Sequence, residues 1–161
     1  MPTVLFICTA NIIRSPIASA LFAQKLEQRG LSKAWQTASA GTWAREGYPA
    51  AREGQELLTT MGLDLSQHRS RMVNESLLKN ADLILVMEKG HKEALWIEFP
   101  AYKDRVYLLS EMCGVETEVR DPIGGTREDF EDTIREIDHW LSQGFSKIIQ
   151  RLHRGDKSLN E

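Results

Sequence analysis

A short apolar run near the start of the chain ends at a cysteine and is followed closely by a helix-start signal. The run Val4 to Ile7 is β-branched and aromatic, which is typical of a buried parallel strand. Ser15-Pro16 then favours the start of a helix, because proline is tolerated in the first helical turn. Cys8, five further residues and Arg14 therefore form a loop between a strand and a helix. This order strongly favours an α/β fold.

The rest of the chain repeats the alternation of strand and helix. Further strands are predicted over 35–41, 82–87 and 105–109, and helices over 16–29, 48–61, 74–80, 88–99 and 126–153. This order predicts a single α/β domain, a four-stranded parallel sheet with helices on both faces. We expect the domain to span 1–154 and 155–161 to form a flexible tail. Ligands bind at the carboxyl ends of parallel strands, where Cys8 stands.

Composition excludes several classes of protein. The 161 residues carry a net charge of -3, so no basic excess points to nucleic acid. Two cysteines are too few for a disulfide framework or a zinc cluster, and no apolar run approaches the roughly 18 residues of a membrane span. The first residues lack the basic segment of a signal peptide. We therefore expect a cytoplasmic protein, a monomer or weak dimer, that binds neither membranes nor nucleic acid.

The loop from Cys8 to Arg14 has the physical character of a phosphate site. Its amides and the first N–H groups of the helix converge on one concavity, which suits a tetrahedral dianion. Arg14 can hold two phosphoryl oxygens with its planar fork. The same positive field favours the thiolate form of Cys8, which would then be a nucleophile. A cysteine followed by an arginine at this spacing is a weak signal alone, because a buried cysteine is usually a small hydrophobe.

The full string from the strand into the helix resembles the active-site loop of the low-molecular-weight protein tyrosine phosphatases. That pattern is an apolar strand followed by C-x-x-N-x-x-R-S-P-x-A, and it is matched by Cys8, Asn11, Arg14, Ser15, Pro16 and Ala18. The resemblance implies Cys8 as nucleophile and Arg14 as catalytic arginine, with no metal and no cofactor. It also implies that phosphate is bound by the loop Thr9, Ala10, Asn11, Ile12, Ile13, Arg14 and Ser15.

The catalytic acid is expected on a loop before the last helix. Cleavage of a phosphate monoester by a thiolate needs a proton for the leaving oxygen and later a base for water, and one carboxyl group can serve both steps. Asp121-Pro122 lies after the fourth predicted strand, where the family has its Asp-Pro acid loop. Asp-Pro-x-Gly-Gly is by itself a turn signal. The resemblance makes Asp121 the predicted general acid.

Four further residues are expected to support the loop. Ser15 is placed to donate a hydrogen bond to the Cys8 sulfur, and Asn11 suits a left-handed backbone position. The resemblance implies that Ser39 and His68 brace Asn11. The other histidines, His91, His139 and His153, are predicted on solvated helix faces, and Cys113 is predicted to be structural.

Substrate preference is expected to depend on the walls of the slot. Ile12 fits an aromatic ring, whereas the resemblance implies a threonine there in arginine phosphatases. The segment Ile123-Gly124-Gly125 lacks the aromatic walls of phosphotyrosine enzymes and resembles the acid loop of protein arginine phosphatases. The glycine pair predicts a pliable loop. Trp43 could form the other wall, and Ile13 stands where many relatives have a second cysteine.

These observations favour a protein tyrosine phosphatase that hydrolyses phosphomonoesters through a cysteinyl-phosphate. Phosphorylated proteins or peptides are the expected partners. A protein arginine phosphatase is the first alternative. Arsenate reduction and a phosphate-binding module without turnover remain open, as does a phosphocysteine carrier. Two cysteines are too few for a three-thiol relay, while Asp121 and Arg14 argue against the module and the carrier.

Overall fold

The computed structural model describes residues 1–156, with side chains to His153. Four strands form one sheet in the order β2-β1-β3-β4, with every pair parallel: β1 (Thr3–Cys8), β2 (Gln36–Gly41), β3 (Leu83–Val86) and β4 (Val106–Leu108). The residues of β3 and all but the first of β1 are buried, as expected for strands covered on both faces. The predicted α/β domain with a four-stranded parallel sheet is therefore confirmed.

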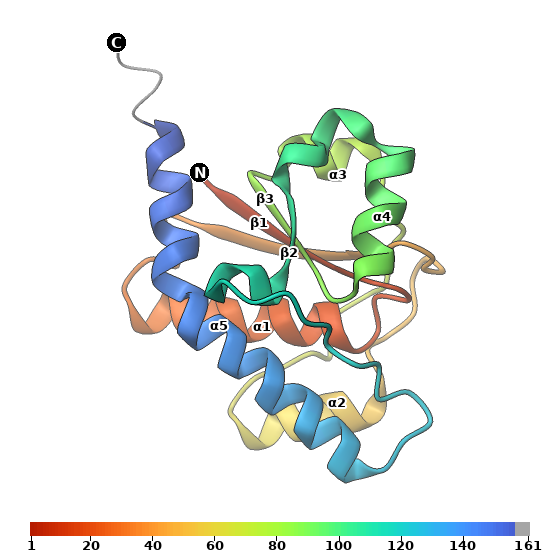
Figure 1. Cartoon of the computed structure of the whole chain (residues 1–161). Helices are drawn as coiled ribbons and strands as arrows, with labels where there is room; N and C mark the ends of the chain where they lie inside the picture. Colours follow the sequence, from red (N-terminus) through yellow and green to blue (C-terminus); the bar gives the residue numbers. More distant parts are fainter. Residues whose placement is uncertain (157–161) are drawn as a thin grey trace.

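Helices cover both faces of the sheet (Figure 1). The helices are α1 (Arg14–Gln28), α2 (Arg52–Thr60), α3 (Glu75–Asn80), α4 (Lys89–Glu98) and α5 (Arg127–Asp156). Alternate β1 residues face opposite sides: Phe6 packs into a core with α1 and α5, while Leu5 packs into a second core with α3 and α4. Two short 3-10 helices, η1 (Pro100–Arg105) and η2 (Leu109–Cys113), were not predicted.

Three predicted boundaries were wrong in an informative way. α1 begins at Arg14, so Pro16 is its third residue. α2 begins only at Arg52, because Ala51 is extended and its N–H donates to the carbonyl of Ile12 at 2.8 Å. This bond ties the segment before α2 to the Cys8 loop. At the other end, α5 continues to Asp156, so 155 and 156 are helical, while the remainder of the expected tail, 157–161, lies outside the described residues.

Within residues 1–156, no helix combines the length and the apolarity that crossing a membrane requires.

Candidate active site

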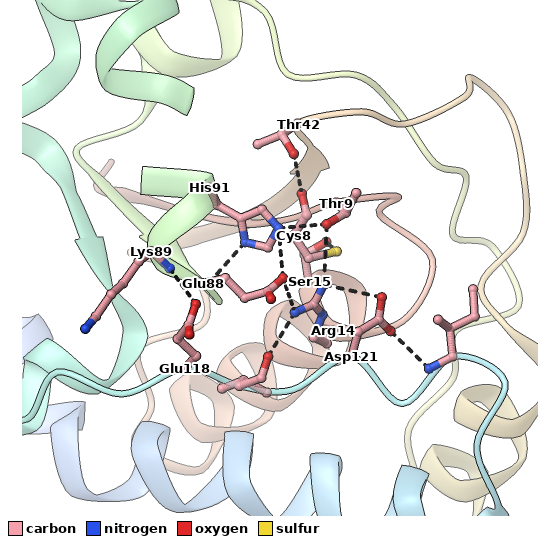
Figure 2. Close-up of polar contacts among 12 residues, drawn as sticks. Cys8, Thr9, Arg14, Ser15, Thr42, Glu88, Lys89, His91, Glu118 and Asp121 are labelled. Carbon is pink, nitrogen blue, oxygen red and sulfur yellow. Dashed lines mark hydrogen bonds and ion pairs between the residues drawn. The ribbon is translucent and has the colours of Figure 1, made fainter. Parts of the chain in front are cut away.

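The loop from Cys8 to Ile13 connects β1 to α1 at the carboxyl end of the sheet (Figure 2). The end of β2 holds it in place: Thr42 N–H donates to the carbonyl of Cys8 and Trp43 N–H to that of Thr9, both at 2.9 Å. Gly41 has no room for a side chain, since a Cβ there would collide with the carbonyl oxygen of Thr9. The loop backbone therefore lies directly against the second strand.

Asn11 fixes the conformation of the loop. Its φ of 57° is left-handed, a region that asparagine tolerates better than most residues. The fully buried side chain donates to Ser15 Oγ at 2.8 Å and to Ser39 Oγ at 2.9 Å, and accepts from Arg71 N–H at 3.0 Å. His68 Nε2 lies 2.7 Å from the Asn11 carbonyl oxygen. The backbone and side chain of Asn11 are thus held from four directions.

The histidine in this group donates through Nε2, because a carbonyl oxygen can only accept. Burial lowers the pKa of His68, and the hydrogen bond to Asn11 opposes this effect. The nearby charges of Arg71 and Arg69 lower the pKa further. The net lowering favours the neutral ring, which still carries the one proton that the bond to Asn11 needs.

The sulfur of Cys8 is buried beside a serine hydroxyl. Sγ lies 2.9 Å from Ser15 Oγ, and Cys8 is 3% exposed. Ser15 Oγ already accepts a hydrogen bond from Asn11, so its own proton is available to the sulfur or to the carbonyl of Ala40 at 3.3 Å. Ser15 is therefore placed to stabilise negative charge on the sulfur.

Arg14 is almost completely buried and is oriented by an acid and a carbonyl. Nη1 donates to Glu88 Oε2 at 2.8 Å and to the Val119 carbonyl at 2.9 Å. Nη2 makes only long contacts, 3.5 Å each, to Asp121 Oδ2 and Thr9 Oγ1. One side of the guanidinium is thus firmly held, while Nη2 can form stronger bonds with an incoming anion.

Asp121 projects from the loop between η2 and α5 towards Arg14 (Figure 2). Its Oδ1 accepts a hydrogen bond from Ile123 N–H at 3.1 Å, and its side chain is 37% exposed. Gly124 has a φ of 73°, and a Cβ on Gly125 would approach Asp129 Oδ2 to 2.5 Å and the Pro122 carbonyl to 2.9 Å. The glycines are therefore needed for a tight turn, which the prediction of a merely pliable loop did not capture.

Two hollows flank this acid loop. The smaller one reaches the sulfur and is lined by Cys8, Ala10, Ile12, Ile13, Arg14, Asp121 and Ile123. The larger one, of about 500 Å³, shares Asp121 and Ile123 with it and is lined in part by the carboxylates Asp129, Asp132 and Glu136. A phosphate dianion is repelled by such carboxylates, so the smaller hollow is the candidate active site.

Comparisons with known proteins agree with this geometry. Residues 3–156 match the sequence model of the low molecular weight phosphotyrosine protein phosphatases. The chain belongs to this family. It is 36% identical, over 86% of its length and 93% of the relative, to the probable low molecular weight protein-tyrosine-phosphatase EpsP of Ralstonia nicotianae. It is 35% identical, over 87% of its length and 92% of the relative, to the protein-arginine-phosphatase of Bacillus subtilis.

A solved structure gives the same result for the fold. The crystal structure of the low molecular weight protein tyrosine phosphatase from T. tengcongensis superposes with a TM-score of 0.87 at 37% identity, covering 91% of this chain and 99% of the other. The resemblance to this phosphatase family that the sequence indicated is confirmed over nearly the whole chain.

Most of the predicted site residues of this family member lie together. Cys8, Arg14 and Asp121 line one hollow, and Ser39 and His68 both contact Asn11. Trp43 binds the Thr9 carbonyl through its backbone N–H and is 81% exposed, so its role as a wall of the slot stays a prediction. Ile123, which the sequence reading regarded only as a non-aromatic position, lines the hollow beside Ile12.

Sequence reasoning missed two residues that this phosphatase places beside Arg14. Glu88 lies two residues after the end of β3 and forms the close ion pair described above. His91, predicted on a solvated face, is only 5% exposed and its Nε2 lies 2.8 Å from Thr9 Oγ1. The solvated assignment was wrong because the first turn of α4 lies against the Cys8 loop, where His91 contacts Thr9. The rule that sites form at strand ends pointed to this segment but did not identify its residues.

Proposed function

We propose that this chain is a protein phosphatase that hydrolyses phosphotyrosine through a cysteinyl-phosphate on Cys8. The observation that carries the proposal is the convergence of Cys8, Arg14 and Asp121 on one hollow at the carboxyl end of β1. Family membership supports the reaction class. Arg14 and the loop amides supply positive charge for the phosphoryl group from the chain itself, so the proposed reaction needs no cofactor.

In the first step the Cys8 thiolate attacks the phosphorus atom. An S–P bond forms while the bond from phosphorus to the substrate oxygen breaks, and protonated Asp121 gives its proton to that oxygen. Arg14 holds phosphoryl oxygens through Nη2, whose contacts to Thr9 and Asp121 are both 3.5 Å long. Since Nη1 is already fixed by Glu88 and Val119, little reorientation of the guanidinium is required.

In the second step water replaces the sulfur. Asp121, now a carboxylate, accepts a proton from water as the water oxygen attacks phosphorus, and the S–P bond breaks to give phosphate and the Cys8 thiolate. Ser15 Oγ, 2.9 Å from the sulfur, stabilises the departing thiolate. Asp121 ends the cycle protonated and ready for the next substrate.

The apolar walls of the hollow favour an aromatic substrate. Ile12 and Ile123 both line it and present methyl groups to whatever carries the phosphate. A phenyl ring packs against such walls, whereas a guanidinium would leave its N–H groups without acceptors there, Asp121 excepted. This chemistry supports phosphotyrosine in proteins or peptides as the substrate.

Phosphoarginine is the second candidate, and the acid loop favours it. Gly124 and Gly125 form a tight turn without aromatic side chains, so a phenyl ring loses one stacking surface. The similarity to the Bacillus subtilis protein-arginine-phosphatase adds weight to this alternative. Asp121 could accept a hydrogen bond from a guanidinium as well as act on its leaving nitrogen.

The test is kcat/KM for matched peptides that carry phosphotyrosine or phosphoarginine. Wild type should prefer phosphotyrosine, and Ile12→Thr should shift the ratio towards phosphoarginine by roughly 10- to 100-fold, the worth of one or two newly satisfied polar groups. Ile12→Val is the control, because it has the shape of threonine without the hydroxyl. A wild-type preference for phosphoarginine would refute the substrate assignment and leave the chemistry of Cys8, Arg14 and Asp121 intact.

The same proposal includes the setting. A cysteine that acts as a thiolate must remain reduced, which supports the cytoplasm as the compartment. We propose that the protein acts as a monomer or weak dimer on phosphorylated proteins, and not on nucleic acids or membranes. Size-exclusion chromatography with light scattering at several concentrations tests the oligomeric state.

A further inference from the structure

His91 is a buried imidazole beside the active site that the proposed reaction does not use. It is the third residue of α4, and its Nδ1 accepts a hydrogen bond from the backbone N–H of Glu88 at 3.1 Å. That N–H is a permanent donor, so Nδ1 must present its lone pair. A neutral ring therefore carries its single proton on Nε2, which faces Thr9 Oγ1 at 2.8 Å.

The surroundings of His91 keep this ring neutral at physiological pH. Burial, and after it the positive charge of Arg14, lowers the pKa of His91 to about 4. The carboxylates of Glu88, Asp121 and Glu118 act in the opposite direction without reversing the effect. A second proton would also have to sit on Nδ1 and oppose the Glu88 N–H. The hydrogen bond thus runs from His91 to Thr9.

The hydroxyl of Thr9 has two donors as neighbours. One is His91 Nε2, and the other is Arg14 Nη2 at 3.5 Å (Figure 2). A hydroxyl that accepts from both has its own proton left for a third group. An anionic oxygen bound to Arg14 Nη2 would lie within about 2.9 Å of that nitrogen, which is the same region as Thr9 Oγ1.

We propose that His91 is a positioning residue that turns the Thr9 hydroxyl into a hydrogen-bond donor to the phosphoryl group held by Arg14. This inference deepens the proposed phosphatase function and rests on it. Glu88 joins the two halves of the arrangement, since its Oε2 lies 2.8 Å from Arg14 Nη1 and 3.4 Å from His91 Nε2. The phosphoryl group thereby gains a neutral donor of fixed direction beside Arg14.

Four variants distinguish this positioning role from a purely structural role of His91 as a cap of α4. His91→Asn keeps an acceptor near the position of Nδ1 for the Glu88 N–H but is too short to reach Thr9. His91→Gln extends an amide N–H towards the position of Nε2. Thr9→Val removes the hydroxyl at constant shape. His139→Asn, at an exposed histidine of α5, is the control for the substitution itself.

The experiment measures kcat/KM on a phosphotyrosine peptide and the affinity for inorganic phosphate by NMR titration. Thr9→Val and His91→Asn should each lower kcat/KM by about 10-fold or more, as expected for one lost hydrogen bond to a charged group. The double variant should be no worse than Thr9→Val alone, and His91→Gln should recover part of the loss. His139→Asn should match wild type.

Several outcomes would overturn the inference. If the losses of kcat/KM in the two single variants multiply in the double variant, His91 acts independently of Thr9. Wild-type kinetics in His91→Asn would show that His91 has no positioning role. Ring nitrogen NMR that finds the proton of His91 on Nδ1 would reverse the assumed direction of the bond. If no phosphoester is hydrolysed, the proposed function is refuted, but the inference on His91 can still be tested. An equal decrease of phosphate affinity in Thr9→Val and His91→Asn would then support the positioning role.

Discussion

Acidification should destabilise this protein through His91, and the size of the effect follows from its burial. The pKa of His91 falls from 6.5 to about 4 on folding, chiefly because the ring is buried and next because Arg14 is close. Between these values the unfolded chain binds a proton that the folded protein excludes, so stability is full above pH 6.5 and decreases as the pH falls towards 4. At about 1.4 kcal/mol per pKa unit, the complete effect is ~3 kcal/mol.

The assay is urea unfolding of wild type and His91→Asn at pH 7.0 and 4.5. Between pH 7.0 and 4.5 the free energy of unfolding should decrease by roughly 2 kcal/mol more in wild type than in the variant, because most of the difference in proton binding lies in this range. His68, whose pKa is lowered in the same direction, is present in both proteins and cancels in the comparison. Equal pH dependence in the two proteins would show that the imidazole of His91 is not kept neutral by the fold. Unchanged slopes with denaturant are required for the comparison.

Three substitutions test the proposed chemistry. Cys8→Ser should abolish turnover yet retain phosphate binding in a titration, and full activity would remove the nucleophile. Arg14→Lys should lower kcat/KM by at least about 100-fold although the charge is kept, because a lysine cannot reproduce the bonds to Glu88, Val119 and the phosphoryl oxygens. Asp121→Ala should slow the hydrolysis of esters of alkyl-like alcohols or ordinary phenols much more than that of an ester of an activated phenol, whose oxygen leaves without a proton. Steady-state rates on the two kinds of ester measure the difference. Equal losses on both would exclude Asp121 as the acid.

The fold was predictable because its strands are marked by local composition. Runs such as Leu83 to Val86 are apolar throughout, and they alternate with helices in a way that few topologies accommodate. The exact ends of the helices were harder to predict. α2 starts late because the carbonyl of Ile12, 39 residues earlier in the chain, accepts a hydrogen bond from the backbone of Ala51, a contact that no local pattern encodes.

The residues of the candidate site also fall into a group that the sequence indicated and a group that it did not. Cys8, Asn11 and Arg14 lie within seven consecutive residues, so the strand before them, the helix start after them and the resemblance to the family pattern together indicated a shared site. Glu88 and His91 come from a different segment, and an acid or a histidine in the first turn of a helix usually faces solvent. Their orientation became visible only when β3 and α4 were placed beside the Cys8 loop. The role of Trp43 as a wall of the slot stays a prediction, because its exposed side chain makes no contact that would assign it.

The pairing of Arg14 with two carboxylates has a consequence for the end of the reaction. The buried guanidinium of Arg14 faces both Glu88 and Asp121, at 2.8 Å and 3.5 Å. At the end of the reaction Asp121 carries a proton, but the Glu88 carboxylate stays 2.8 Å from Arg14 Nη1 and offsets part of the positive charge that holds inorganic phosphate. We therefore expect the site to hold its product loosely, and turnover to continue at phosphate concentrations that would saturate an arginine without acidic neighbours.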